Sequence, residues 1–235
     1  MTQVMKSVER KTAPKKRRLP PLRNGEYMDQ KTFHERYEAM PAHVRAELIG
    51  GIVYMASPQK LPHGRSNLLV VRWLTEYEEA TPGTEVLPGV TDKLGPKSEP
   101  EPDHCLLISP EYGGQSTEDK RGYLCGAPEL IIETSSTTEF RDLHQKKADY
   151  EEARVLEYVV LALRSKRVFW FVLRSGKYQE MKPDADGIYR SRVFPGLWLD
   201  PEALLRRDRK KLLAVLRKGL ASEEHQRFVK KLGAK

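Results

Sequence analysis

The feature that most constrains the fold is the apolar run Leu130-Ile131-Ile132, which leads directly into Glu133. An apolar run that does not alternate with polar residues is typical of a strand covered on both faces. Residues 139–153 then have helical spacing, and residues 155–163 form a second apolar stretch. We therefore expect a buried strand, a helix and a further strand in this order.

Periodicity and turn residues define the remaining elements. We expect a helix over residues 28–40, a strand pair or a strand entry over 46–55 with Gly50-Gly51 as the turn, and a helix over 63–79. Thr137 or Thr138 is expected to cap the helix over 139–153. Further strands are expected at 85–94, 103–109 and 168–173, with a surface loop at 111–121, a hairpin that pairs 178–181 with 188–193, and a C-terminal helix over 202–216.

Composition limits the class of protein. A chain of 235 residues can bury a core without disulfides, and Cys105 and Cys125 lack the spacing of a zinc site, so we expect buried, reduced thiols. No apolar run approaches the roughly 18 to 20 residues needed to cross a bilayer, and the N-terminus is polar and basic. We therefore expect a soluble, cytoplasmic protein without a membrane segment.

The net charge of +8 is concentrated at the two ends of the chain. Residues 1–23 and residues 202–235 each carry a net charge of +7, whereas residues 24–201 carry −6. A basic arm can bind phosphate without reading sequence, so Lys15, Lys16, Arg17 and Arg18 are candidate nucleic-acid contacts; a solubilising tail is the alternative. We expect a disordered arm over 1–24, a domain over 25–203, and a basic helix and tail over 204–235.

Two carboxylates fall where strand ends meet. If the strand that begins at Asp103 pairs antiparallel with the strand that ends at Glu133, both side chains lie at one edge of the sheet. Such a pair suits a hard cation such as Mg²⁺, which prefers oxygen ligands and keeps several waters. A backbone carbonyl near Thr134 is a candidate third ligand.

Lys146 occupies an unusual position for a lysine. It shares the inward stripe of its helix with Leu143, Tyr150 and Ala153, whereas Lys147, about 100° round the helix, is expected to face solvent. The Lys146 ammonium could orient an attacking water or stabilise charge on a phosphorane. A half-buried salt bridge to Asp103 or Glu133 is the structural alternative.

Several motifs together resemble the Uma family of restriction endonucleases. They are, in chain order, Glu47-Leu48-Ile49-Gly50-Gly51, His63, Pro102-Asp103, Gly126-Ala127-Pro128-Glu129-Leu130-Ile131-Ile132-Glu133, Arg141-Asp142-Leu143 with Lys146 and Tyr150, Glu157-Tyr158, and Phe194-Pro195-Gly196-Leu197-Trp198-Leu199-Asp200. The resemblance covers about three quarters of the chain.

The resemblance implies an α/β domain with a restriction-endonuclease-like PD-(D/E)xK fold, a mixed β-sheet flanked by α-helices. It places site residues at Glu47, Asp103, Glu133 and Lys146, with His63, Asp142 and Tyr150 as a second tier. His63 could contact phosphate or a metal-bound water, or could make only a packing hydrogen bond. Thr134-Ser135 follows Glu133 where many such nucleases carry a lysine, so the lysine is expected from the next helix.

These observations predict a Mg²⁺-dependent endonuclease that hydrolyses phosphodiester bonds in DNA, with Mn²⁺ as a possible substitute and no small-molecule cofactor. Cutting both strands of a duplex needs two sites, so we expect a homodimer. The alternative is a noncatalytic nucleic-acid-binding or assembly module that keeps the nuclease fold. A third possibility is that the arms bind RNA or an acidic protein.

Overall fold

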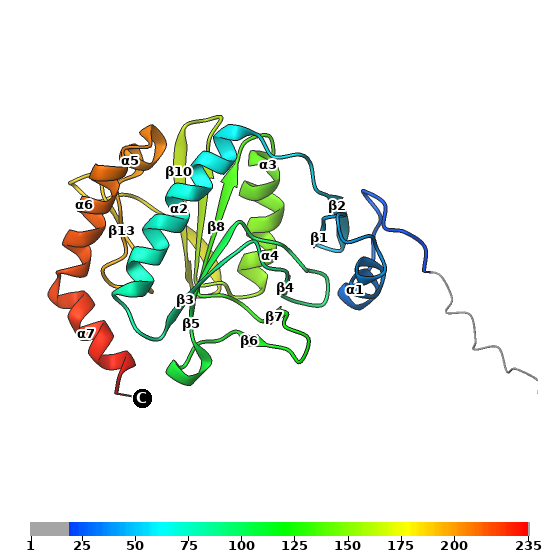
Figure 1. Cartoon of the computed structure of the whole chain (residues 1–235), viewed down its shortest axis with the longest axis horizontal. Helices are drawn as coiled ribbons and strands as arrows, with labels where there is room; N and C mark the ends of the chain where they lie inside the picture. The colour runs from blue at the N-terminus through cyan, green and yellow to red at the C-terminus, as the bar shows by residue number, and fades with distance from the viewer. Residues whose placement is uncertain (1–18, 235) are drawn as a thin grey trace, which may run out of the picture.

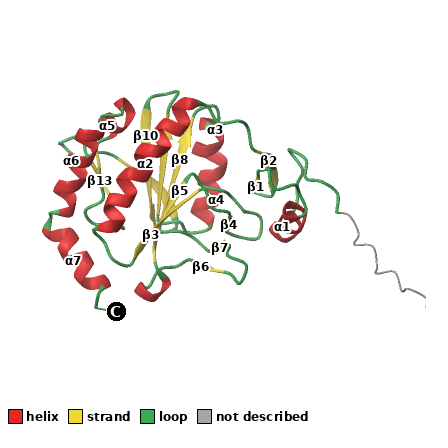
Figure 2. Ribbon diagram, in the orientation of Figure 1, coloured by secondary structure: helices red, strands yellow, loops and turns green. Residues whose placement is uncertain are grey.

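The computed structural model describes residues 19–234, so the four basic residues from Lys15 to Arg18 lie outside the described residues. A six-stranded sheet forms its centre, in the strand order β11-β10-β9-β8-β5-β3 (Figures 1 and 2). In chain order, the strands are β3 (Thr84–Pro88), β5 (His104–Ile108), β8 (Leu130–Ser135), β9 (Glu157–Ala162), β10 (Arg167–Arg174) and β11 (Lys177–Met181).

The sheet is mixed. The two central strands β8 and β9 run parallel, while every other neighbouring pair within this sheet is antiparallel. Every residue of β8 and β9 is buried, as the unbroken apolar run predicts. The expected fold, a mixed sheet flanked by helices, is confirmed.

Helices cover both faces of the sheet (Figure 1). One face packs against α2 (Leu61–Glu79), α5 (Pro201–Arg206) and α6 (Arg209–Leu220) in the largest apolar cluster. The other face packs against a π-helical turn (Asp142–Lys146) and α4 (Lys147–Glu152), which continue the helical segment that begins with α3 (Glu139–Arg141). A last helix, α7 (Glu223–Leu232), follows α6.

A smaller unit flanks the sheet. It consists of α1 (Gln30–Glu38) and the hairpin of β1 (Ala46–Ile49) and β2 (Ile52–Met55), with its own apolar cluster around Phe33 and Leu48. Leu22 is buried in this cluster, and the Arg36 guanidinium donates hydrogen bonds to the carbonyls of Pro20 and Pro21. The segment over residues 20–22 therefore packs on α1.

One predicted strand and one predicted hairpin differ from the structure. The strand expected over 85–94 is divided into β3 and the short β4 (Asp92–Lys93), which joins β7 (Leu124–Cys125) and β6 (Thr117–Glu118) in a separate small sheet. The hairpin expected between 178–181 and 188–193 does not form. Instead, β11 pairs with β10, because Ser175 and Gly176 both adopt positive φ angles and make a tight turn, and β12 (Tyr189–Arg190) pairs with β13 (Trp198–Leu199).

Other predicted local features also differ from the structure. The helix expected over 202–216 is two helices, because Arg207 adopts a left-handed conformation (φ 59°) that ends α5, and Asp208 caps α6 through the N–H of Lys211. Thr138 occupies the N-cap position of α3, as expected, but its hydroxyl donates to the Asp142 carboxylate and makes no capping bond to a backbone N–H. The loop expected over 111–121 contains a 3₁₀ turn (Pro110–Tyr112) and β6.

The two thiols are free, and only Cys105 is fully buried; Cys125 is partly exposed. Among the residues that the structure describes, no helix combines the length and apolar character required to cross a membrane.

Candidate active site

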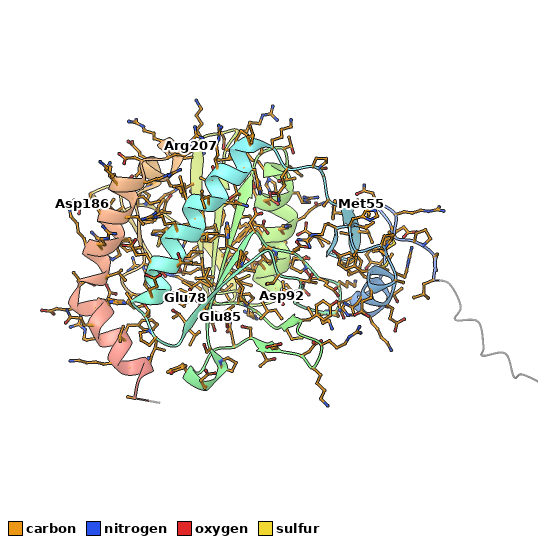
Figure 3. All side chains as sticks on the ribbon, viewed as in Figure 1. Met55, Glu78, Glu85, Asp92, Asp186 and Arg207 are labelled. Atoms are coloured by element: carbon orange, nitrogen blue, oxygen red, sulfur yellow. The ribbon has the colours of Figure 1, made fainter. Side chains whose placement is uncertain are left out.

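A pocket of about 860 Å³ opens where the C-terminal end of β8, the start of α2 and the β1–β2 hairpin converge. Met55, at the end of the hairpin, lines it and is labelled in Figure 3. Six of the sequence-predicted site residues line the same pocket: Glu47, His63, Asp103, Glu133, Asp142 and Lys146. The structure thus brings together residues that lie up to about a hundred positions apart in the chain.

Asp103 and Glu133 meet because β5 and β8 are antiparallel, as predicted. The last pair of this ladder is His104 with Ile132, so one further step places Asp103 opposite Glu133. The N–H of Thr134 donates a 2.8 Å hydrogen bond to Asp103 Oδ2. The amide group of Thr134 thus holds the Asp103 carboxylate in place, and a backbone carbonyl near Thr134 stays a candidate third metal ligand.

Two side chains of α2 hold the other Asp103 oxygen. His63 Nε2 lies 3.1 Å from Oδ1, and Asn67 Nδ2 donates to Oδ1 over 3.2 Å. Burial raises the pKa of Asp103, but the hydrogen bonds and charge of His63, with the N–H of Thr134, outweigh it and lower the pKa below its usual value. The same contact raises the pKa of His63.

Lys146 joins two carboxylates. Its Nζ lies 2.6 Å from Glu47 Oε1 and 2.9 Å from Glu133 Oε1, and the residue is only 3% exposed. Burial favours the neutral amine, but the charges of Glu133 and Glu47 outweigh burial and raise the pKa of Lys146. Lys146 is therefore a charged ammonium inside the pocket wall.

Glu133 is in an environment with more negative than positive charge. Burial is the largest cause that raises its pKa to about 8, and the charges of Asp103, Asp142 and Glu47 add to it, whereas Lys146 acts in the opposite direction. The Tyr150 hydroxyl also donates a 2.8 Å hydrogen bond to Glu133 Oε1. One lysine does not balance this group of carboxylates, and a further cation would relieve their repulsion.

The helical segment after β8 places three of the candidate side chains on one face. Asp142, Lys146 and Tyr150 are spaced four residues apart and are all buried. The Asp142 carboxylate accepts hydrogen bonds from the hydroxyls of Ser135 and Thr138. A π-helical turn, which is common at functional sites, spans this part of the segment.

Lys147 does not face solvent freely, contrary to the prediction. Its side chain is partly buried, and its Nζ lies 4.2 Å from the centre of the Phe171 ring. A long lysine side chain can lie along an apolar surface while its ammonium stays near water, which explains the difference.

Sequence reasoning missed two residues of the site. Asn67 lies four residues after His63, so the helical spacing alone would have placed both on one face. Arg141 lines the pocket and stacks 4.8 Å from the centre of the Tyr54 ring, a contact that joins the β1–β2 hairpin to α3 and that no local pattern indicates.

The donor chemistry of the pocket fits a hard divalent cation. Mg²⁺ is commonly held by one or two carboxylates together with waters and substrate phosphate, and Asp103 and Glu133 provide such a pair. Within residues 19–234, no group of three or more His, Cys, Asp or Glu side chains forms a ready-made metal cage. Any cation would therefore depend on substrate or water for its remaining ligands.

Comparison with protein-family models matches residues 32–202 to Uma2, described as "Putative restriction endonuclease". The chain belongs to the Uma2 family. It is similar in fold to a solved structure from Anabaena variabilis, described as a "putative nuclease belonging to DUF820", with a TM-score of 0.55, 13% identity, and coverage of 73% of this chain and 96% of that chain. A comparison with curated proteins finds no match. The resemblance drawn from the sequence motifs is confirmed.

Proposed function

We propose that this Uma2 protein is a divalent-metal-dependent endonuclease that hydrolyses phosphodiester bonds in DNA. The observation that carries the proposal is the buried ammonium of Lys146 between Glu47 and Glu133, in a pocket whose other wall presents Asp103. A paired acid site with one buried lysine suits phosphoryl chemistry, in which negative charge builds on the phosphorus oxygens.

Each residue would have a distinct role. Asp103 and Glu133 would hold Mg²⁺ or Mn²⁺, which when bound would polarise the phosphate and lower the pKa of a coordinated water. Lys146 would position water or stabilise charge in the transition state, and Glu47 would hold the Lys146 ammonium in place. His63 and Asn67 would fix the orientation of Asp103, and Tyr150 that of Glu133.

A cleavage assay on supercoiled, linear and single-stranded DNA tests the proposal. We expect cleavage that requires added Mg²⁺ or Mn²⁺ and is abolished by EDTA. Cleavage without added metal in the presence of EDTA, or no cleavage of any of the three substrates, would contradict it.

The alternative function is a noncatalytic nucleic-acid-binding module. The two ion pairs of Lys146 favour it in one respect, because they already satisfy one oxygen each of Glu47 and Glu133. Binding of Mn²⁺, followed by the electron paramagnetic resonance signal of free Mn²⁺, separates the two functions. A nuclease should bind Mn²⁺ tightly, and Asp103→Asn should weaken that binding. A noncatalytic module does not require Mn²⁺ binding at this site.

We propose that the active form is a homodimer, since a duplex presents two strands to be cut. The edge strand β11 carries charged residues such as Lys177 and Glu180, which disfavour pairing through that edge of the sheet. The other edge strand, β3, and the helical C-terminal part are the remaining candidate surfaces. Light scattering that gives a monomer at micromolar concentration, with and without DNA, would contradict the dimer.

A further inference from the structure

A second pocket, of about 560 Å³, lies beside the first and has a different character. Four basic side chains line it, with one carboxylate: Arg65, Lys166, Arg206, Arg207 and Glu202. Glu202 lies 3.5 Å from Arg206 in an exposed pair, so the lining keeps a strong excess of positive charge. We call this surface the basic pocket.

The basic pocket and the candidate active site open at the same end of the sheet. Ser136, just after β8, lines the active-site pocket, and Leu163, just after β9, lines the basic pocket. Because β8 and β9 are parallel neighbours, these two positions lie side by side, and the N–H of Leu163 bonds the carbonyl of Ser135. Figures 1 and 3 show the starts of α2 and α3, and Arg207, at this end.

The first turns of α2 separate the two pockets. His63 and Asn67 face the active-site pocket, whereas Pro62, Arg65 and Ser66 line the basic pocket. The two sets lie on different sides of one helix, since successive residues are about 100° apart. A ligand that extends past the start of α2 can therefore contact both pockets.

The β9–β10 turn that carries Lys166 is fixed to the active-site side of the molecule. The Glu139 carboxylate on α3 accepts hydrogen bonds from the N–H groups of Arg164 and Ser165, at 2.7 and 3.0 Å. The turn is thus held in place relative to the helical segment that carries Lys146.

Two of the basic residues occupy backbone positions that favour glycine. Lys166 has φ 53° and Arg207 has φ 59°, in the left-handed region, and both side chains are exposed. A residue with a Cβ is disfavoured there, and such strain is concentrated at functional sites. At both of these positions, where glycine would relax the backbone, the chain carries an exposed cation.

We propose that the basic pocket binds the backbone phosphates of the DNA strand that runs past the active site. The inference rests on the proposed nuclease function. Five carboxylates and four Lys/Arg side chains line the active-site pocket, so it has no excess of cations with which to attract a polyanion, and the basic pocket beside it has one. The basic pocket supplies this excess within the described domain, independently of the charged arm.

The backbone conformations allow a clean test. The double variant Lys166→Gly, Arg207→Gly removes two positive charges. Because glycine adopts positive φ angles without strain, the backbone should keep its conformation and the melting temperature should not fall. Arg154→Gly is the matched control, because Arg154 is also a cation with a positive φ (71°) but precedes β9, at the opposite end of the sheet. Arg65→Gln, an exposed change within α2, is a second variant in case a glycine alters its turn.

Affinity for a non-specific duplex is measured in EDTA over a series of salt concentrations. We expect the slope of log K against log salt to fall by about 0.9 for each phosphate that the protein no longer neutralises, hence by about 2 in the double variant and about 1 in Arg65→Gln. Arg154→Gly should keep the wild-type slope.

The possible results separate the two proposals. Wild-type slopes in both the double variant and Arg65→Gln, in a protein that binds DNA, would overturn the basic pocket and leave the nuclease proposal standing. The expected decrease in slope in a protein without cleavage activity would support the pocket and contradict catalysis. A wild-type protein that binds no DNA at low salt would overturn both.

Discussion

The Lys146 ammonium lies 2.9 Å from Glu133 Oε1, and both side chains are almost fully buried. A structural salt bridge and a catalytic lysine were separate interpretations of the sequence, but this contact allows one residue to be both. Lys146→Ala is therefore expected to affect two measurements. It should abolish metal-dependent cleavage, and it should lower stability by about 3 to 5 kcal/mol, because it leaves buried carboxylates unpaired.

Cleavage by Lys146→Ala should be assayed well below the melting temperature of the variant, with DNA affinity measured alongside. Loss of cleavage with unchanged DNA affinity would support a catalytic role for Lys146, since a catalytic lysine is needed mainly to stabilise the transition state. A folded variant that cleaves at the wild-type rate would limit Lys146 to a structural role.

Lys147→Ala is the matched control, although it will not be silent. Its ammonium lies 4.2 Å from the centre of the Phe171 ring, so its removal should cost about 0.5 to 1 kcal/mol of stability. Cleavage should stay at the wild-type level. Loss of cleavage in Lys147→Ala together with its retention in Lys146→Ala would mean that the site has been assigned to the wrong lysine.

Asn67 gives a test of how Asp103 is positioned. Its amide donates to Asp103 Oδ1 over 3.2 Å and also lies 2.9 Å from His63 Nε2. We expect Asn67→Ala to reduce cleavage or metal affinity by about 10- to 100-fold, as is typical when a group that orients a ligand is removed. Thr75→Ala, two turns further along α2, is the control, and equal activities in the two variants would argue against this role.

Glu157 should make stability depend on pH near neutrality. Burial raises its pKa to about 7, despite hydrogen bonds from the Ser191 hydroxyl and the N–H of Arg192. An acid whose pKa is higher in the folded state binds its proton more tightly there. Its contribution to stability is therefore complete below pH 4.5 and is lost as the pH rises to about 7, roughly 3 kcal/mol in all.

Glu157→Gln should remove this dependence. The unfolding free energies of the wild type and the variant are measured by urea denaturation at pH 4.5 and at pH 8. Between these two pH values the wild type should lose roughly 3 kcal/mol of stability relative to the variant. A difference in stability between the two proteins that is the same at both pH values would show that Glu157 does not titrate in this range.

The basic arm should be tested by deleting residues 1–18 rather than 1–23. The shorter deletion keeps buried Leu22 and the contacts of Arg36 with Pro20 and Pro21. It removes seven of the eight basic residues that lie within residues 1–23. We expect weaker DNA binding with a lower salt slope and an unchanged melting temperature; an unchanged slope would leave the arm as a solubilising tail.

The sequence predicts the centre of the site better than its surroundings. Asp103 and Glu133 could be paired because antiparallel neighbours bring the start of one strand to the end of the next, and Lys146 could be placed because helical spacing is regular. Asn67 could have been added from its helical spacing to His63, whereas the contact of Arg141 with Tyr54 is set by packing between distant segments.

The errors in the predicted fold have a similar physical origin. The helix break after α5 depends on Arg207, which adopts a left-handed conformation that glycine usually takes. Because the residue is an arginine, the local sequence does not indicate the end of this helix. The pairing of β11 was missed because the turn at Ser175-Gly176 competes with the loop at residues 184–187, and local turn preferences do not decide between them.

Metal-dependent cleavage by carboxylate variants tests the central claim most directly. Wild type, Asp103→Asn, Glu133→Gln and the control Glu129→Gln are incubated with supercoiled DNA and Mg²⁺ or Mn²⁺. Glu129 is a buried glutamate that precedes β8, at the opposite end of that strand from the pocket, and its carboxylate accepts hydrogen bonds from the N–H groups of Ile108 and Gln115. We expect cleavage by the wild type and Glu129→Gln and none by Asp103→Asn or Glu133→Gln. Wild-type cleavage rates in folded Asp103→Asn and Glu133→Gln would contradict the assignment of the active site.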